Sequence, residues 1–406
     1  MLDKLKRPYG YEYIGDNDPL LEARRVDRCP NCSPPSADGS TGGDPVCTEP
    51  IWAVVYDSWY LATREFAGMI FQDALIWIPG GDSGNIVALS MADGSISRTI
   101  DIATAVGTND FWEMSSFAGV GADGVTLFFS GFDGLNIDGD QIVMVNTTTD
   151  AVTTGLPGLE YTTPGLVDNT NGVLWLAGSA SSATPGTLFA LDQTTLAATG
   201  VSIAWINDGV NAPKLAHDTT NNHLWRTNTA LTNIYIYSAV DGSLVTTLSA
   251  VTTAPDVITS LEFVPTKGWV IVGMRIGAYH EFAIYDATTY TLVASIADVE
   301  GALIKSGYDF KYVPTADEFL LSAQLTNTSK PHKMYIFDGT DFHYKGEIPL
   351  TYFSPLTDLT VPSLTAATDL NGGGLFVVDR CDIFIQDIYA HPVTGNVDLV
   401  LFRFNR

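Results

Sequence analysis

The sequence predicts an all-β protein in which one small unit recurs seven times, and three observations support this prediction. From about residue 66 onward, a strand of small residues, a turn rich in Asp, Asn, Gly or Pro, and a strongly apolar second strand recur as a hairpin. A third strand that ends on a small polar residue follows each hairpin. The copies are spaced by about 50 residues, which is the spacing of blades made from four short strands. We therefore expect a seven-bladed β-propeller.

The seven hairpins and the ends of the third strands can be located residue by residue. The predicted hairpins span Met69–Trp77, Gly119–Phe128, Leu166–Leu176, Ala216–Trp225, Phe263–Val272, Tyr312–Leu321 and Ala367–Val378. The third strands end at Ser90, Asn146, Asp192, Ser238, Asp286, Asp338 and Asp387. Because Asp, Asn and Ser side chains accept hydrogen bonds from nearby backbone N–H groups, we expect these residues to cap the turn into a fourth strand.

Several copies continue with such a turn and a fourth strand, as in MADGSISRTI, AVDGSLVTTL and ATTYTLVASI. With these segments the chain resembles the β-propeller superfamily, in particular its YVTN-type and quinoprotein-like repeats, over roughly residues 51–406. The resemblance implies a propeller fold but little about activity, because propellers include binding proteins, scaffolds and enzymes. The His and Trp-Asp signature of WD-repeat proteins is missing from the repeats.

Two apolar segments compete for the outer strand of the last blade. Ile51–Asp57 precedes the first hairpin, and Val397–Phe404 follows the last one. Pairing strands from both ends of the chain within one blade closes the ring and removes free strand edges, which invite aggregation. We therefore divide the chain into an extended N-terminal arm, residues 1–50, and a propeller, residues 51–406, that is closed by N- and C-terminal strands.

The charge balance excludes some classes of partner. The chain has 406 residues, with 46 acidic and 20 basic side chains and a formal net charge of −26 at pH 7. Nucleic acids and anionic lipid surfaces are disfavoured as partners, because both bind positive protein surfaces. No stretch approaches the roughly 20 apolar residues that span a bilayer, and the N-terminal segment lacks an apolar signal region. We expect no membrane span and no signal peptide.

The composition of the surface indicates in which environment the protein works. Charged residues make up 16% of the chain, below the roughly 25% typical of soluble domains, and Thr, Ser, Asn and Gly take their place. Such a surface is typical of proteins that work outside a cell or in salty water. A virion component, made in the cytoplasm without a signal peptide and then working in the extracellular medium, combines these features. The cytoplasm of a salt-accumulating host is the alternative.

The N-terminal arm is predicted to dock onto a protein partner. Residues 1–50 have little apolar periodicity and cannot build a core alone. Basic residues concentrate there, and a cationic arm on an anionic body favours docking onto an acidic neighbour, such as another copy of the chain in a homo-oligomer or larger assembly. An unattached terminus is the alternative. The candidate docking residues are Lys4, Lys6, Arg7, Arg24, Arg25 and Arg28.

The four cysteines are candidates for a structural cross-link. Cys29 and Cys32 have the C-x-x-C spacing of a zinc knuckle, and Cys47 follows in the same arm. Cys381 belongs to the predicted closing blade, so we expect it near Cys47. Three arrangements remain open: a structural zinc site, disulfides that pin the arm to the propeller, and unlinked thiols.

Aromatic and acidic residues on the predicted connecting loops are the candidate ligand-binding or partner-binding site. Aromatic rings beside carboxylates suit a glycan or a protein receptor, although the same carboxylates could act as an acid/base pair or belong to ordinary exposed loops. Asp133–Asp140 also resembles a shortened calcium loop without the final Glu of an EF-hand. The candidate residues are Trp112, Glu113, Asp133, Asp138, Asp140, Trp205, Asp208 and Tyr352.

Two histidines, His217 and His223, lie near opposite ends of one predicted hairpin turn. We expect both to be solvated turn residues, with a metal site as the alternative.

The leading functional hypothesis is a non-enzymatic propeller that serves in a virion for assembly or host attachment, with no required cofactor and no catalytic residues. The first alternative is a propeller enzyme, a hydrolase or lyase, that acts on polysaccharide through its acidic loops. A soluble interaction scaffold of a halophilic cell is the second alternative.

Overall fold

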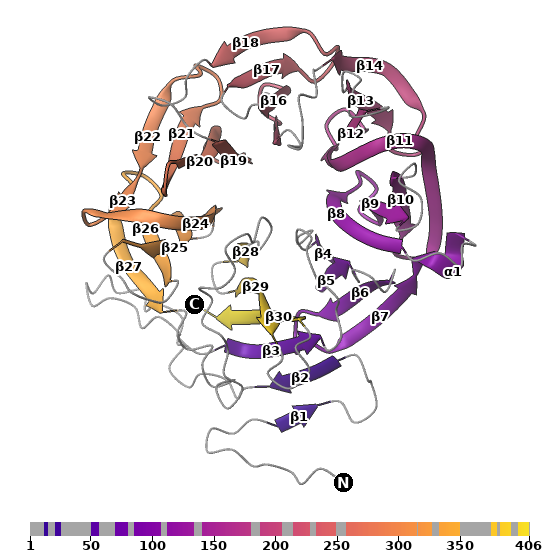
Figure 1. Cartoon of the computed structure of the whole chain (residues 1–406), viewed down its shortest axis with the longest axis horizontal. Coiled ribbons are helices and arrows are strands. Elements are labelled where there is room, and N and C mark those ends of the chain that lie inside the picture. Colours follow the sequence, from indigo (N-terminus) through magenta and orange to yellow (C-terminus); the bar gives the residue numbers. More distant parts are fainter. Residues whose placement is uncertain are drawn as a thin grey trace.

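The chain folds as a β-propeller, as predicted. The computed structural model describes residues 12–14, 21–25, 50–56, 70–79, 85–106, 112–133, 140–179, 187–204, 214–227, 233–248, 257–314, 316–326, 333–349, 375–379, 382–390 and 397–405. Their strands pair into antiparallel sheets that follow one another around a ring in chain order (Figure 1). In each four-stranded sheet the earlier strands lie toward the middle of the ring and the later strands toward its rim (Figure 1).

Four sheets contain four or five strands each. The first contains β4 (Ile70–Gln72), β5 (Leu75–Pro79), β6 (Asn85–Ser90) and β7 (Ile96–Asp101). The next two contain β15 (Leu215–Asp218), β16 (His223–Thr227), β17 (Ile234–Ser238) and β18 (Leu244–Leu248), and then β19 (Val257–Val264), β20 (Trp269–Ile276), β21 (Tyr279–Asp286) and β22 (Leu292–Ile296). The fourth contains β23 (Asp298–Val299), β24 (Ala302–Val313), β25 (Glu318–Leu325), β26 (Lys333–Asp338) and β27 (Tyr344–Pro349).

A fifth sheet has seven strands, so the predicted count of seven separate blades is not confirmed: the described strands form six sheets. The reason is β11, which is 18 residues long and pairs with β10 through its first part and with β12 through its last part. The strands of this sheet are β8 (Trp112–Val120), β9 (Thr126–Asp133), β10 (Asp140–Asn146), β11 (Ala151–Asp168), β12 (Val173–Ser179), β13 (Thr187–Asp192) and β14 (Ala198–Ala204).

The sixth sheet joins the two ends of the chain. Its strands lie in the order β28 (Leu375–Asp379), β29 (Asp382–Ala390), β30 (Val397–Asn405), β3 (Pro50–Tyr56), β2 (Leu21–Arg25) and β1 (Glu12–Ile14). Both segments that competed for the outer strand are therefore in this sheet, with β30 next to β29 and β3 outside β30. Two pieces of the N-terminal arm, β2 and β1, extend the sheet outward from β3 (Figure 1).

The predicted caps at the ends of the third strands are confirmed in the part of the chain whose side chains are described. Asp192 Oδ1 accepts hydrogen bonds from the backbone N–H groups of Thr194 (3.0 Å) and Thr195 (2.8 Å). Asn146 and Asp286 make the same pair of bonds. A bond from the N–H group two residues on is made to the side chains of Ser90, Ser238 and Asp338. Asp387 lies within β29, and its side chain is outside the described residues.

The fourth residue after each cap adopts the left-handed conformation. Its N–H group donates to the carbonyl of the cap residue in all six described turns. Glycine suits this conformation, whereas another residue costs roughly 1 kcal/mol there. Two turns carry glycine and four do not, the six residues being Gly94, Asp150, Leu196, Gly242, Tyr290 and Phe342.

The side chains in this conformation reach back to the unit that precedes them in the ring. The ring of Tyr290, in the turn after β21, lies 5.9 Å from the ring of Trp225 on β16. The ring of Phe342, after β26, lies 5.4 Å from that of Trp269 on β20. Leu196 packs in the cluster that contains Phe128 from β9. The contact with the preceding unit offsets the backbone strain.

The same proximity explains one of the two glycines. A Cβ atom on Gly242 would lie 3.3 Å from side-chain atoms of Val201 and Ile203 on β14, in the preceding sheet. At Asp150, by contrast, a charged side chain fits, and it forms an ion pair with Arg98 on β7 of the preceding sheet. The turn after the third strand is therefore a contact point between successive units of the ring.

Apolar side chains fill the space between neighbouring sheets. Phe310 on β24 stacks on Phe319 on β25, with ring centroids 5.0 Å apart, and contacts Phe282 on β21 in the preceding sheet. Three tryptophans, Trp77, Trp175 and Trp225, occupy the same position in β5, β12 and β16 and are fully buried. Each buried side chain of this size contributes about 2–3 kcal/mol of transfer free energy, so the sheets are held mainly by this packing.

The described part of the chain contains one short helix, α1 (Ile102–Val106), which begins where Asp101 caps the N–H group of Thr104 at 2.9 Å. Among the described residues, no helix combines the length and the apolar character needed to cross a membrane.

The turn geometry predicts an unusual order of stability at Phe342. Phe342→Ala removes the ring contact and keeps the left-handed strain, whereas Phe342→Gly removes both. We expect Phe342→Gly to be less stable than the wild type by about 1–2 kcal/mol, and Phe342→Ala to be less stable than Phe342→Gly by about 1 kcal/mol. Chemical denaturation measures both free energies of unfolding.

Val240 provides the control, because it is exposed and is not among the residues with positive φ. At Val240 the usual order is expected, with the Ala variant more stable than the Gly variant. The same usual order at Phe342 would contradict the assigned conformation.

Candidate functional site

Four of the predicted loop residues come together at one end of β8, β9 and β10. Trp112 is the register partner of Asp133, and Glu113 that of Phe132. Asp140 starts β10 beside the same end, since its neighbour Gln141 pairs with Gly131. We call this end of each sheet, opposite its hairpin turns, the loop end. The backbone places Trp112, Glu113, Asp133 and Asp140 there, while their side chains lie outside the described part.

Most other predicted site residues fall outside the described residues. Among the basic arm residues, Arg24 and Arg25 are on β2, opposite Ala53 and Trp52 of β3. The remaining predicted residues lie in segments that the structure does not describe, and they are Asp138, Trp205, Asp208, Tyr352, Lys4, Lys6, Arg7, Arg28, Cys29, Cys32, Cys47 and Cys381.

The described side chains with polar chemistry gather at the opposite end of the sheets, where the first strand turns into the second and the third into the fourth. We call the polar side chains that link neighbouring units there the turn belt. Gln72 donates to the carbonyl of Gly124, which joins the first sheet to the seven-stranded sheet. Asn221 donates to the hydroxyl of Thr288 at 3.1 Å, which joins the sheets of β15–β18 and β19–β22. Such bonds join successive sheets from β4–β7 around to β23–β27.

Gln193 is the member of the turn belt inside the seven-stranded sheet. Its Oε1 accepts from the backbone N–H of Ala122 at 3.0 Å, and its Nε2 donates to the carbonyls of Asp168 and Val173 at 3.1 and 3.0 Å. Gln193 is 9% exposed. Its amide bonds to backbone groups of both turns, so it holds the turns of β8–β9 and β11–β12 together.

Asp168 is the centre of the most buried part of the belt. Asp168 is fully buried, and its carboxylate accepts from the N–H and the side chain of Asn171 at 2.9 and 2.6 Å and from Trp175 Nε1 at 3.3 Å. His217 Nδ1 lies 3.4 Å from its Oδ1. Asn171 and Asn222 then exchange amide hydrogen bonds between the two sheets.

The expectation of solvated turn histidines was wrong for His217, whose side chain is 4% exposed. The sequence signal was available, because LVDNTNGVLW and AHDTTNNHLW are aligned copies in which the residue before the Asp is Val167 in one and His217 in the other. A histidine in place of an apolar residue at a core position indicates a polar partner. His223, the second histidine, is bonded to the Tyr290 hydroxyl at 3.1 Å.

A second charged group lies between the sheets of β19–β22 and β23–β27. Lys267 Nζ is 2.6 Å from Asp317 Oδ1, and the Tyr312 hydroxyl donates to the same oxygen at 2.7 Å. The ammonium also lies 5.5 Å from the ring centres of Trp269 and Tyr312. The hydrogen bond with Asp317 raises the pKa of Lys267, and the bonds from Lys267 and Tyr312 lower the pKa of Asp317. Both groups stay charged at neutral pH.

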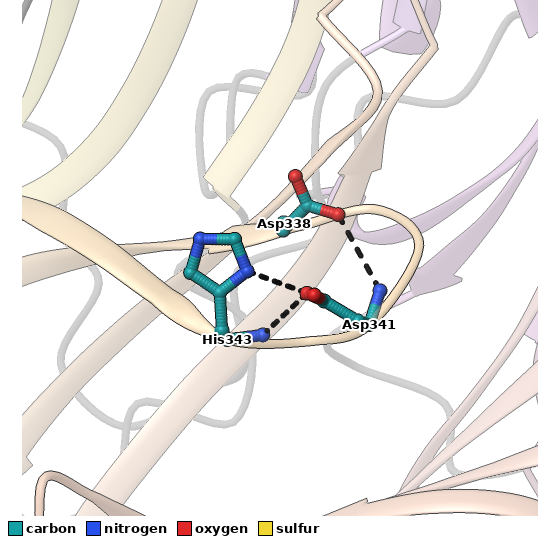
Figure 2. Close-up of side chains that lie close together, drawn as sticks. All are labelled: Asp338, Asp341 and His343. Carbon is teal, nitrogen blue, oxygen red and sulfur yellow. Dashed lines mark hydrogen bonds and ion pairs between the residues drawn. The ribbon is translucent and has the colours of Figure 1, made fainter. Parts of the chain in front are cut away.

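Asp338, Asp341 and His343 form a third group, with ligand atoms within 4.8 Å of one another (Figure 2). All three belong to the turn between β26 and β27. Asp341 Oδ1 is 2.5 Å from His343 Nδ1, and the Asp338 carboxylate accepts the N–H of Thr340 at 2.8 Å. The bond from His343 lowers the pKa of Asp341. Each group thus has a partner within the turn, and turn stabilisation accounts for the arrangement.

The turn carboxylates share one electrostatic property. Hydrogen bonds from the Thr195 hydroxyl and from the backbone of Thr289 hold the pKa of Asp192 and Asp286, respectively, below the ordinary value for aspartate. A carboxylate that accepts several hydrogen bonds in its charged form gives up that form only at acid pH. These groups are therefore acceptors within turns and poor general acids.

The comparisons with known proteins agree with the fold. No protein-family model matches the chain, and no curated protein sequence matches it. Among solved structures, the chain is similar to the β-propeller domain of Cps50 (Swd1) from Myceliophteria thermophila, with a TM-score of 0.50, 11% identity, and coverage of 84% of this chain and 98% of that one. It is also similar to the dihydro-heme d1 dehydrogenase NirN, solved with DHE, with a TM-score of 0.51, 12% identity, and coverage of 73% and 62%. This similarity shows the β-propeller fold alone.

The cap at Asp286 gives a prediction about pH. Asp286→Ala removes the cap and should lower the free energy of unfolding by about 1 kcal/mol at pH 7. Asp286→Asn keeps the acceptor oxygen, as Asn146 does in its own turn, and should change little. Because the folded pKa of Asp286 is lowered, its carboxylate stabilises the fold above the unfolded pKa, and this contribution is lost as pH falls through the folded pKa.

Chemical denaturation at pH 7 and at about pH 3.5 measures the effect. Between pH 7 and about pH 3.5, the wild type should lose more free energy of unfolding than Asp286→Asn does, since an amide does not titrate. An Ala variant as stable as the wild type at pH 7 would mean that the cap does not contribute.

Proposed function

We propose that the chain is a non-enzymatic structural and binding propeller of a virion, used in particle assembly or host attachment. The observation that carries the proposal is the turn belt, whose polar groups are bonded to one another across successive sheets. Groups engaged in this way hold a rigid ring and are poor acids or bases. A rigid ring with its longer connections at the loop end suits recognition, because binding residues are commonly carried by loops on a stable scaffold.

The charge distribution supports docking through the N-terminal arm. The net charge of −26 disfavours docking onto another uniformly acidic surface, whereas the arm carries six of the twenty basic residues. The arm is proposed to tether the ring to an acidic neighbour in the particle. Its strands β1 and β2 lie outside β3 in the closing sheet (Figure 1).

The ring is further proposed to have seven blades of the YVTN type, with the seven-stranded sheet counted as two blades that share β11. Three features support this count. The register between β11 and β12 shifts between Glu160 and Thr163 and again between Thr163 and Leu166. The capped turn occurs twice in this sheet, at Asn146 and at Asp192. A shared strand that leaves the rim of one blade and enters the middle of the next connects blades in a propeller.

A polysaccharide-acting enzyme is the second candidate, and one observation favours it. Trp112, Glu113, Asp133 and Asp140 come together at the loop end of β8–β10. An aromatic ring beside two or more carboxylates is the residue set that glycosidases use.

A glycan panel separates the two candidates. The full chain and an Asp138→Asn/Asp140→Asn variant are incubated with polysaccharides, and binding, new reducing ends and unsaturated products are measured. The binding-module proposal predicts no product from either protein. Product formation by the wild type that falls by at least about 100-fold in the variant would favour the enzyme instead.

The arm is tested by deleting residues 1–49, which leaves β3 in place to pair with β30. We expect the shortened chain to keep its circular-dichroism spectrum and to lose incorporation into particles, because the ring closes through β3 and the arm makes the tether. A variant with Arg24 and Arg25 changed to Ser is the matched test of charge on β2. Incorporation at the normal level by both proteins would remove the case for tethering. A steep loss of stability at low salt would favour the halophilic scaffold.

A further inference from the structure

Asp168 and His217 form a buried pair between two sheets. Asp168 ends β11 in the seven-stranded sheet, His217 lies on β15 in the next sheet, and their side chains are 0% and 4% exposed. His217 Nδ1 is 3.4 Å from Asp168 Oδ1, and His217 Nε2 is 3.0 Å from Asn222 Oδ1. Both ring nitrogens therefore face an oxygen atom, and a neutral imidazole has only one N–H group to donate.

A chain of hydrogen bonds from Asp168 fixes the orientation of Asn222. A carboxylate oxygen only accepts, so the Asn171 atom 2.6 Å from Asp168 Oδ2 is the amide nitrogen. The same nitrogen lies 2.7 Å from an Asn222 atom, which must then be the oxygen Oδ1. Because that oxygen faces His217 Nε2, the proton of the neutral ring would be on Nε2.

The remaining question is the state of Nδ1. The Asp168 carboxylate accepts from the N–H and side chain of Asn171 and from Trp175 Nε1, and three donors favour its charged form. A bare Nδ1 would point its lone pair at this charged oxygen, which is repulsive. A protonated Nδ1 makes a charge-assisted contact with it instead.

The charged and titratable groups of the surrounding elements are consistent with a positive ring. Asp218 follows His217 on β15 and is fully buried, with its oxygens bonded to Thr220 and Asn221. His223 on β16 is bonded to Tyr290 from the turn after β21. Arg226, also on β16, lies over the rings of Tyr235 and Tyr237.

We propose that His217 is held as the charged imidazolium and that its ion pair with Asp168 is a pH-sensitive clasp between the seven-stranded sheet and the sheet of β15–β18. Raising the pH removes the Nδ1 proton and leaves a buried carboxylate facing a lone pair. Breaking one partner of a buried ion pair is strongly destabilising, so this seam weakens in alkali. The positions equivalent to His217 are Val167 on β11, Phe263 on β19 and Tyr312 on β24. None of these residues can carry the charge of an imidazolium, so the clasp belongs to one seam of the described ring.

Nuclear magnetic resonance of the full chain labelled with ¹⁵N-histidine tests the charge directly. The sequence has six histidines. At pH 7 we expect an imidazolium signal that disappears in His217→Gln and that converts to the signal of a neutral ring in alkali. If the signal that disappears in His217→Gln is that of a neutral ring at pH 7, the proposal is overturned. If this variant does not fold, single Gln variants of the other five histidines assign the signal by elimination.

Thermal unfolding tests the clasp itself. Between about pH 6 and pH 8.5, the melting temperature of the wild type should fall by about 3 °C more than that of His217→Gln. Asp168→Asn should remove the same extra fall. Asp218→Asn is the matched control at the equivalent position of the next turn, and it should retain the extra fall. Identical pH dependence in the wild type and His217→Gln would overturn the proposal.

Discussion

The ring depends on contact between successive sheets, because four apolar clusters of the described residues each join two neighbouring sheets. Four of the six sheets are only four or five strands wide, and apolar side chains of three of them are buried against a neighbouring sheet. The capped turn after the third strand makes this contact directional. It holds residues such as Tyr290 and Phe342 in a strained backbone conformation from which their rings reach the preceding sheet. The strain persists because the contact offsets it.

Polar bonds add specificity to this apolar packing. Hydrophobic contact is non-directional and would tolerate a sheet that slides against its neighbour. Hydrogen bonds of the turn belt do not, since the amides of Asn171 and Asn222 pair in only one relative position of their sheets. Buried polar groups that lose their partners are costly, so the belt penalises every other register. The end of the ring that carries the turn belt is therefore its rigid end.

The sequence predicted the repeating elements well because their signals are local. A turn former between two β-rich runs is enough to place a hairpin, and the caps at Asn146, Asp192 and Asp286 follow from side-chain chemistry alone. The count of sheets and the state of His217 depend on pairing between distant segments, which local pattern does not encode. β11 continues through Pro157 and Pro164, where a sequence argument expects interruption, because it changes partner along its length.

The acidic residues of the turn belt differ in their role from those at the loop end. A chain with a net charge of −26 repels itself when compact, and the belt limits this cost by pairing its acids with N–H groups, Lys267 and Arg98. Acids used as acceptors in turns are poor candidates for a reactive centre. Trp112, Glu113, Asp133 and Asp140 meet at the loop end. Recognition is consequently expected at the loop end, on a ring whose other end is already committed to holding its shape.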